Sequence, residues 1–134
     1  MFSEKEIEYL KTQRLARIGT VSSKGQVDVA PVAYEFDGKQ FFIGGRNMIK
    51  TKKYWNVKKN KKIALVVDDL ETVDPWKPRG IKIHGTAELI ERQGRFGSGS
   101  YIRFIPEIHW SWGVEEPVFV DGKYTYKKIK HENK

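Results

Sequence analysis

The stretch from Gly44 to Lys62 is the densest cluster of cations in the sequence. Its nineteen residues, GGRNMIKTKKYWNVKKNKK, include eight lysines and arginines and no acid. Apolar spacing predicts a helix that starts near Ile49 or Lys50 and ends at Lys59. Because the first amides of a helix have no partner inside it, a helix start beside cations is suited to binding an anion.

This helix start predicts a phosphate site. The expected ligands are backbone amides, the Thr51 hydroxyl and the cations of Arg46, Lys52 and Lys53. Each charge-assisted contact would contribute about 1.5 to 3 kcal/mol. The alternative is a solvated face, which is what most lysine runs form. The later lysines are interpreted in that way: Lys58, Lys59, Lys61 and Lys62.

No acid–base or metal apparatus is visible in the rest of the sequence. Asp68, Asp69 and Glu71 follow an apolar strand, which favours a polar strand end over a catalytic pair of carboxylates. The histidines share no metal-ligand spacing, so no metal site is expected at His84, His109 or His131. The motifs GxSxG, GxxxxGK[ST] and GxGxxG are absent. Nucleophilic catalysis by the chain itself is therefore not expected.

Composition limits the class of protein and its partners. The 134 residues suit one domain, residues 1–134, and the lack of cysteine favours the cytoplasm over an oxidising compartment. The net charge of +8 favours negatively charged partners: nucleic acid, an anionic membrane surface or a phosphorylated small molecule. The acidic, amphipathic start MFSEKEIEYL and the lack of a long apolar run lead us to expect a soluble, unprocessed protein with no membrane partner.

Local patterns predict the elements that position the basic stretch. Ser3 and Glu6 form a capping-box pair ahead of a short helix that ends near Gln13. Alternating apolar residues then predict strands joined by turns at residues 23–25 and at Asp37–Gly38. These strands span residues 15–22, 26–36 and 39–45.

Beyond the basic helix the sequence predicts four more strands. Residues 62–69 are apolar on both faces, which favours the middle of a sheet. Proline and glycine predict a loop at 70–80 and a flexible connection at 94–100. The tail from Lys130 is expected to fray. The remaining strands span residues 81–91, 101–113 and 117–129, the last with a turn at Asp121–Gly122.

Successive hairpins with one N-terminal helix and one crossover helix predict a mainly β fold. We expect an antiparallel β-barrel of six or more strands. A barrel of this length often leaves one face exposed, so we also expect a homodimer.

Long segments of the sequence resemble the pyridoxamine 5'-phosphate oxidase-like split-barrel flavoproteins. The segments are EIEYLKTQRLARIGTVSSKGQVDVAPVAYEFDG, IGGRNMIKTKKYWNVKKN, VVDDLETVDPWKPRGIKIHGTAELIE and RFIPEIHWSWG. The third is similar to the signature of the branch that uses the deazaflavin coenzyme F-420, whereas the first two are shared across the superfamily. The resemblance covers the chain to about Gly113 and implies an antiparallel split β-barrel.

The resemblance also implies a homodimer with two cofactor sites in the clefts between subunits. Each site would bind coenzyme F-420 or FMN and serve a small-molecule substrate. Hydride transfer takes place on such a cofactor, so the protein has only to bind, orient and exclude water. In the family, two strand segments border the flat ring and a basic helix start holds the phosphate. The residues that match are Ile18, Gly19, Thr20, Val21, Ala30, Pro31, Val32, Ala33, Arg46, Thr51, Lys52 and Lys53.

Aromatic and basic residues later in the chain are further candidates for lining the cleft, either of their own subunit or of the partner. They are Trp76, Arg79, Trp110 and Trp112. A role as loop anchor or dimer core is the alternative for the tryptophans. The chain departs from the family at Val27 and at Asn60–Lys61, where proline and Asn-Pro are common, and these changes concern local geometry. Residues 114–134 match no part of the family and could form an extra hairpin or a swapped arm.

The net charge leaves other functions open. A small barrel with basic grooves and aromatic residues could bind single-stranded nucleic acid, and a cofactor-binding protein could act as a carrier without turnover. The first alternative requires aromatic residues along solvent-facing strands, whereas the basic residues here gather at one helix start. Lys50 and the lysines of residues 58–62 are more cations than one phosphate requires. They favour the deazaflavin over FMN, because only the deazaflavin carries an acidic tail that they could attract.

Overall fold

Helix α1 (Glu4–Thr12) starts where the capping box predicts. In the computed structural model, which describes residues 1–132, the Ser3 side chain accepts a hydrogen bond from the Glu6 amide. The Glu6 carboxylate accepts one from the Ser3 amide at 2.9 Å. This reciprocal cap satisfies two amides at the helix start. Tyr9 and Leu10 then carry the apolar face of the helix into the core.

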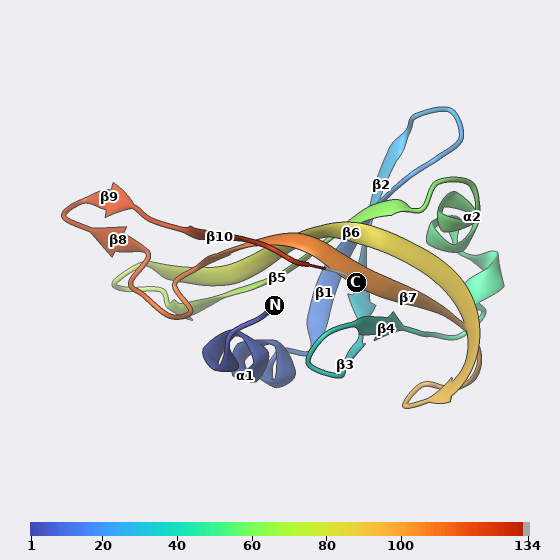
Figure 1. The fold of residues 1–134 in the computed structure, drawn as a ribbon, viewed down its shortest axis with the longest axis horizontal. Coiled ribbons are helices and arrows are strands. Elements are labelled where there is room, and N and C mark those ends of the chain that lie inside the picture. Colours follow the sequence, from blue (N-terminus) through green and yellow to red (C-terminus); the bar gives the residue numbers. More distant parts are fainter. Residues whose placement is uncertain (133–134) are drawn as a thin grey trace.

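The strands form one antiparallel sheet and a separate two-stranded hairpin (Figure 1). The sheet has eight strands in the order β2-β1-β5-β6-β7-β4-β3, with β10 also paired to β7. Because β2 and β3 are separated only by Tyr34, the two ends of this path meet and the sheet curls on itself. The strands are β1 (Leu15–Val21), β2 (Val27–Ala33), β3 (Glu35–Phe36), β4 (Phe41–Ile43), β5 (Lys62–Thr72), β6 (Lys77–Gly94), β7 (Gly97–Trp112) and β10 (Lys127–Lys130), and the hairpin is β8 (Phe119–Val120) with β9 (Lys123–Tyr124). The expected mainly β split barrel, with an N-terminal helix and a crossover helix, is confirmed.

The core follows the period-two alternation of the strands. Ile63, Leu65 and Val67 of β5 point inward and are buried. Ala64 and Val66 on the other face are half-buried, so the second apolar face of β5 lacks full cover within one chain. β5 lies between β1 and β6, as predicted for a strand that is apolar on both faces. Each buried aliphatic side chain contributes about 1.5 to 3 kcal/mol.

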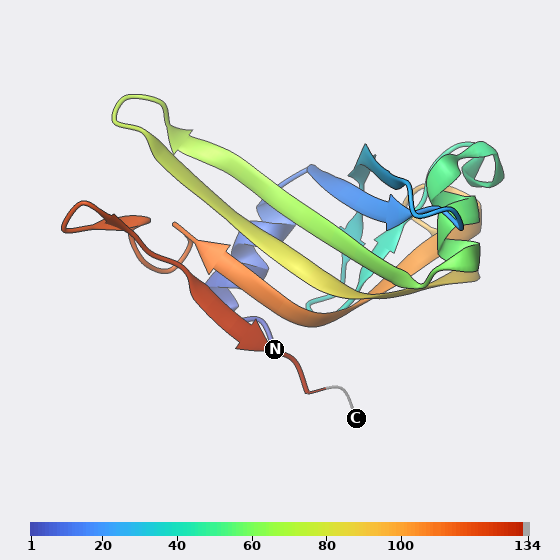
Figure 2. The ribbon, with the colours of Figure 1, turned by 90° about the horizontal axis from the view of Figure 1, so that it is seen from above.

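Two segments predicted as loops are strands instead. β5 and β6 continue to Thr72 and Lys77, so residues 70–80 are the end of a long hairpin and not a loop. Pro78 pairs with Leu70 next to a register shift, and such an irregular strand end tolerates a residue without an amide donor. The segment 94–100 is also a tight hairpin, because Gly94 pairs with Gly97 and the Tyr101 hydroxyl donates to the Gly97 carbonyl. Seen from above, the β5–β6 turn and helix α2 (Lys52–Lys59) lie at opposite ends of the sheet (Figure 2).

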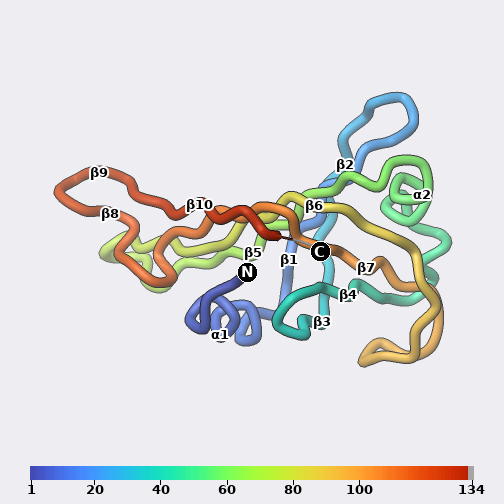
Figure 3. Tube along the Cα trace, viewed as in Figure 1, coloured from blue at the N-terminus to red at the C-terminus, as the bar shows by residue number. Residues whose placement is uncertain are grey.

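The C-terminal segment makes a hairpin and then returns to the sheet. Figure 3 traces the chain from the end of β7 through β8 and β9 and back along β7 as β10. Asp121 and Gly122 both have positive φ, as the predicted Asp-Gly turn requires. The expectation of a frayed tail from Lys130 is wrong for Lys130 and His131. Lys130 pairs with Ile108, and the His131 amide donates to the Glu107 carbonyl at 2.7 Å. Glu132 is exposed and has no regular structure, and residues 133–134 lie outside the described residues.

The helices of the described chain are short. α1 has nine residues and α2 has eight, and among residues 1–132 neither they nor any other helix is long and apolar enough to cross a membrane.

Candidate functional site

Helix α2 begins later than the sequence predicts. Met48–Lys50 forms a single 3-10 turn, and Thr51 is extended with φ −99° and ψ 150°. The Thr51 hydroxyl accepts from the Tyr54 amide at 3.4 Å and caps a helix that starts at Lys52, not at Ile49 or Lys50. Threonine is favoured at such a position because its hydroxyl oxygen accepts the hydrogen bond of a first-turn amide that has no backbone acceptor within the helix.

The shape of the loop before α2 depends on Asn47 and Gly44. Asn47, with φ 55°, adopts the left-handed conformation. Gly44 is needed for space, since a Cβ there would lie 2.5 Å from the Tyr101 ring, whereas a Cβ at Gly45 would meet nothing within 4 Å. Tyr101 is buried against the strand that leads into the loop. The close approach of this ring therefore fixes where β4 ends and the basic loop begins.

The predicted phosphate ligands lie in the loop before α2 and at its start, and the Thr51 hydroxyl already has a partner within the chain. Arg46 and Lys52 are exposed, and Lys53 is half-buried. Burial lowers the pKa of Lys53, and the nearby Asp28 carboxylate partly offsets that effect. The Thr51 hydroxyl donates to the Met48 carbonyl at 2.6 Å, so its hydrogen is already committed. An anion at this point would be bound by the free first amides of α2 and by the three cations, and Thr51 would hold the helix start in place.

The strands β1 and β2 divide the predicted ring contacts between two faces. Ile18 pairs with Ala30, and Gly19 pairs with Val29. On the inner face Ile18, Thr20 and Val32 are buried, so their side chains belong to the core. Ala30 also lies on the inner face and packs against the core. The outer face carries the other four candidates, Gly19, Val21, Pro31 and Ala33. A flat ring placed on the outer face could contact this second group directly and the first group only through backbone atoms.

A buried hydrogen bond connects the two parts of the site. The Asn56 side-chain amide of α2 donates to the Thr20 hydroxyl of β1 at 3.0 Å. Thr20 is 1% exposed and Asn56 is 9% exposed, so loss of this bond would leave buried polar groups without a partner and would destabilise the fold. Thr20 thus positions α2 against β1, a role that the sequence did not indicate because the partners are 36 residues apart.

The structure places the remaining candidates far from α2 within one chain. Trp76 lies in the β5–β6 turn with 58% exposure, at the opposite end of the sheet from α2 (Figure 2). Trp112 packs on Gly80, where a Cβ would lie 2.6 Å from the indole. Trp110 lies beside Lys82, whose Nζ is 4.5 Å from the ring centroid. A single subunit therefore does not bring these residues to the start of α2.

Arg79 is held by neighbours of its own chain. Its guanidinium donates to both oxygens of Asp69, at 2.7 and 3.0 Å, and lies 5.1 Å from the Tyr9 ring centroid. The hydrogen bond from Arg79 holds the pKa of Asp69 below its usual range despite partial burial. Asp68 pairs with Arg17 at 3.1 Å. These contacts give both carboxylates partners within the chain, but Asp68 and Asp69 lie inside β5, which continues to Thr72, and not at the strand end that the sequence suggested.

Sequence reasoning missed a buried polar network. His109 Nε2 lies 2.9 Å from the Glu6 carboxylate, and His109 Nδ1 lies 2.7 Å from His131 Nε2. Phe2 stacks on His109 with ring centroids 4.5 Å apart. Burial lowers the pKa of His131 to about 4. For Glu6, burial acts to raise the pKa, but hydrogen bonds from His109 and from Ser3 outweigh it and lower the value to about 2.

This network joins both ends of the chain to β7, and its members are too far apart in sequence for spacing to reveal them. Among the residues that the structure describes, no group of three or more histidines and acids could hold a metal ion.

Comparison with known structures defines the class of this fold. The chain is similar to the HupZ protein of Group A Streptococcus, with a TM-score of 0.68 and 22% identity, covering 83% of this chain and 94% of that one. It is also similar to a proposed pyridoxamine 5'-phosphate oxidase of Lactobacillus delbrueckii, with a TM-score of 0.62 and 20% identity, covering 81% and 92%. At these identities the likeness shows the fold alone, which is the split barrel of pyridoxamine phosphate oxidase-like proteins.

Sequence comparison then shows the family. The family model of pyridoxamine 5'-phosphate oxidase matches residues 2–110. The chain is 38% identical over 120 residues to the 5a,11a-dehydrotetracycline/5a,11a-dehydrooxytetracycline reductase of Streptomyces rimosus, covering 85% of this chain and 84% of the relative. The chain belongs to the pyridoxamine 5'-phosphate oxidase-like family of oxidoreductases.

Proposed function

We propose that the protein binds a phosphorylated flavin-type cofactor and transfers hydride to or from a small organic molecule. The observation that supports this proposal is the start of α2, where Thr51 caps the helix and Arg46, Lys52 and Lys53 lie within a few residues of its first amides. An anion site at this helix start, together with the exposed outer face of β1 and β2, would suit a ring that carries a phosphate.

The chain's own residues would bind and orient the cofactor. When bound, the cofactor supplies the hydride chemistry. The α2 amides and cations would hold its phosphate, and Gly19 and Pro31 on the outer face would lie against its ring. The Thr20–Asn56 hydrogen bond would keep these two parts in register, since both side chains are buried.

We also propose that the protein is a homodimer and that its partner subunit completes the site. The outer face of β1 and β2 exposes apolar side chains that a single chain leaves in water: Leu15 by 50%, Val27 by 61% and Val29 by 66%. Exposed apolar patches of this kind favour burial against another surface. The candidates Trp76, Arg79 and Trp112 lie at the far end of the sheet, so only a second copy could bring such residues to the cofactor. In a two-fold dimer both sites would be completed in the same way.

Coenzyme F-420 is our preferred cofactor, with FMN as the alternative. Both carry a phosphate that the α2 start could hold, and the deazaflavin continues into an acidic tail. Residues 39–62 carry nine lysines and arginines and no acid, more charge than one phosphate requires. Long-range attraction between this region and the tail would favour the deazaflavin.

The relative from Streptomyces rimosus suggests the direction of the reaction. That protein is a reductase of a dehydrotetracycline. We propose that this chain likewise reduces its substrate, a small molecule of its own. The lack of cysteine favours the cytoplasm as its location.

Charge reversal at the helix start tests the proposal. Arg46→Glu or Lys53→Glu should weaken cofactor binding at least about tenfold, or ~1.4 kcal/mol, because a positive contact becomes a repulsion. Lys59→Glu, an exposed charge at the end of the same helix, is the matched control and should change binding little. The measurement is a titration of purified protein that follows ring fluorescence. Equal losses from Lys53→Glu and Lys59→Glu would mean that only diffuse charge matters.

One surface favours a second function, the binding of single-stranded nucleic acid. Trp110 on β7 pairs across the sheet with Lys82 on β6 and Lys128 on β10. Both lysine Nζ atoms lie near its ring, at 4.5 and 5.7 Å from the centroid. This arrangement offers a base-stacking residue beside cations. Tight binding of an oligonucleotide that Trp110→Ala abolishes would favour this function over the cofactor.

A further inference from the structure

A cavity lies between the β5–β6 turn and the segment that follows β7. Its volume is about 430 Å³, and its apolar lining comprises Pro75, Trp76, Pro78, Val118 and Phe119, among others. The size matches pockets that hold a drug-sized molecule. Trp76 is 58% exposed and Phe119 is 47% exposed, so both rings present apolar surface to the opening.

The walls of this cavity are fixed by packing and hydrogen bonds. Gly113, with φ 67°, lies so close to β6 that a Cβ would be 2.5 Å from the Pro78 carbonyl oxygen. The Thr125 amide donates to the Val118 carbonyl at 2.7 Å, and its hydroxyl donates to the Pro117 carbonyl at 2.9 Å. These bonds hold the segment after β7 in place. The cavity is therefore a defined feature of the fold.

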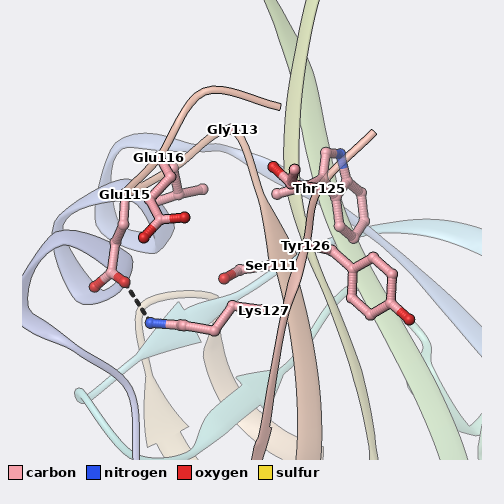
Figure 4. Close-up of a pocket in the computed structure, with 9 residues that line it drawn as sticks. Ser111, Gly113, Glu115, Glu116, Thr125, Tyr126 and Lys127 are labelled. Atoms are coloured by element: carbon pink, nitrogen blue, oxygen red, sulfur yellow. Dashed lines mark hydrogen bonds and ion pairs between the residues drawn. The ribbon is translucent and has the colours of Figure 1, made fainter. Parts of the chain in front are cut away.

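The cavity is acidic although the chain as a whole carries a net charge of +8. Glu71, Glu115, Glu116 and Lys77 line it. Figure 4, a close-up of the neighbouring pocket that shares Glu115 and Glu116 with this cavity, shows Glu115 turned toward Lys127, with which it forms an ion pair. Glu116 lies beside Glu115 on the same turn. Within residues 1–132, the carboxylates of Glu71 and Glu116 form no hydrogen bond or ion pair. Even with Lys77 counted, the lining thus keeps a net negative charge beside exposed aromatic rings.

We infer that this cavity binds a planar aromatic small molecule that carries a positive charge. Aromatic rings attract a cation through the negative charge on their faces, and they stack on a planar ring. Glu71 and Glu116 would add Coulomb attraction that a neutral or anionic molecule could not gain. The net positive charge of the protein disfavours cations in general. Local attraction by Glu71, Glu116 and the aromatic rings would therefore have to select a cation for this cavity.

The inference names the class of substrate for the proposed reductase, and to that extent it rests on the proposed function. Trp76 is also a candidate to line the partner's cofactor cleft, so a molecule held beside it would face that cofactor in the proposed dimer. Binding to the cavity itself requires no cofactor. The two proposals can therefore fail separately.

The test uses three probes with one ring system: N-methylacridinium, neutral acridine and acridine-9-carboxylate. Titration of the full-length protein at neutral pH, followed by probe fluorescence, should show the cation bound about tenfold or more tighter than the carboxylate. Trp76→Ala should lower the affinity for the cation about tenfold, whereas Trp55→Ala, a similarly exposed tryptophan on α2, should not. The pair Glu71→Gln and Glu116→Gln should remove the preference for the cation while acridine binding stays unchanged.

Several results would overturn the inference. Equal binding of the three probes would exclude selection by charge. Unchanged affinity in Trp76→Ala would place the probe elsewhere. Affinity that falls as the protein concentration rises toward full dimerisation would show that a second copy covers the cavity. A parallel titration with coenzyme F-420 and FMN separates these outcomes from failure of the proposed function, because it reports on the phosphate site at the start of α2, which shares no residue with the lining of the cavity.

Discussion

Replacing Thr20 by valine tests whether this residue positions α2 or contacts the cofactor. The substitution preserves the shape of the side chain and removes the acceptor for the Asn56 amide, which lies 3.0 Å away in a buried site. A buried donor left without a partner costs about 1 to 3 kcal/mol. We therefore expect Thr20→Val to lower the free energy of unfolding by about 2 kcal/mol. The double variant Thr20→Val with Asn56→Leu should recover part of this loss, because no unpaired polar group remains.

The assay is urea unfolding of each variant, with a cofactor titration on the same samples. Thr86→Val is the matched control: Thr86 lies half-buried on β6, and its hydroxyl makes no hydrogen bond within residues 1–132, so its change should stay within about 0.5 kcal/mol. Cofactor affinity should fall in Thr20→Val by less than in Arg46→Glu. Unchanged stability together with a large loss of cofactor affinity would refute a positioning role and place the hydroxyl against the cofactor.

Two further predictions concern stability. Burial lowers the pKa of His131 from 6.5 to about 4, so the folded state resists protonation and should lose stability as the pH falls from 6.5 toward 4. Unfolding of His131→Gln should lack that loss, while the contribution of Glu6, whose pKa is lowered from 4.5 to about 2, should remain and vanish only below pH 4.5. Identical pH dependence in both proteins would show that His131 is not buried in solution. Gly44→Ala should destabilise the protein by about 1 to 3 kcal/mol, because its Cβ would lie 2.5 Å from the Tyr101 ring. Gly45→Ala, whose Cβ would meet nothing within 4 Å, is the control and should not destabilise it. Equal thermal unfolding of the two variants would contradict the packing of the Tyr101 ring.

The parts of the fold that depend on neighbours in sequence could be predicted. The capping box of Ser3 and Glu6, the turn at Asp121–Gly122 and the central position of β5 are examples. Each is determined by residues within a few positions of one another or by the apolar pattern of one strand. The location of the basic loop and helix was predicted for the same reason.

The errors arise where distant contacts decide the structure. Proline and glycine near residues 70–80 and 94–100 suggested loops, but cross-strand pairing extends β5, β6 and β7 through them. In the network of Glu6, His109 and His131, the bonded pair Glu6 and His109 is 103 positions apart. Thr51 illustrates a finer error, since only the structure shows that its hydroxyl caps α2 and bonds to a carbonyl.

The central claim is that the start of α2 holds the phosphate of a flavin-type cofactor. The most direct measurement is a side-by-side titration of the purified protein with coenzyme F-420 and FMN at low and moderate salt, following ring fluorescence. We predict saturable binding of coenzyme F-420 that is tighter than that of FMN and that weakens more with salt, because more ion pairs are screened. Tighter binding of FMN would reverse the choice of cofactor and leave the phosphate site in place. Binding of neither cofactor, with tight binding of an oligonucleotide, would contradict the central claim.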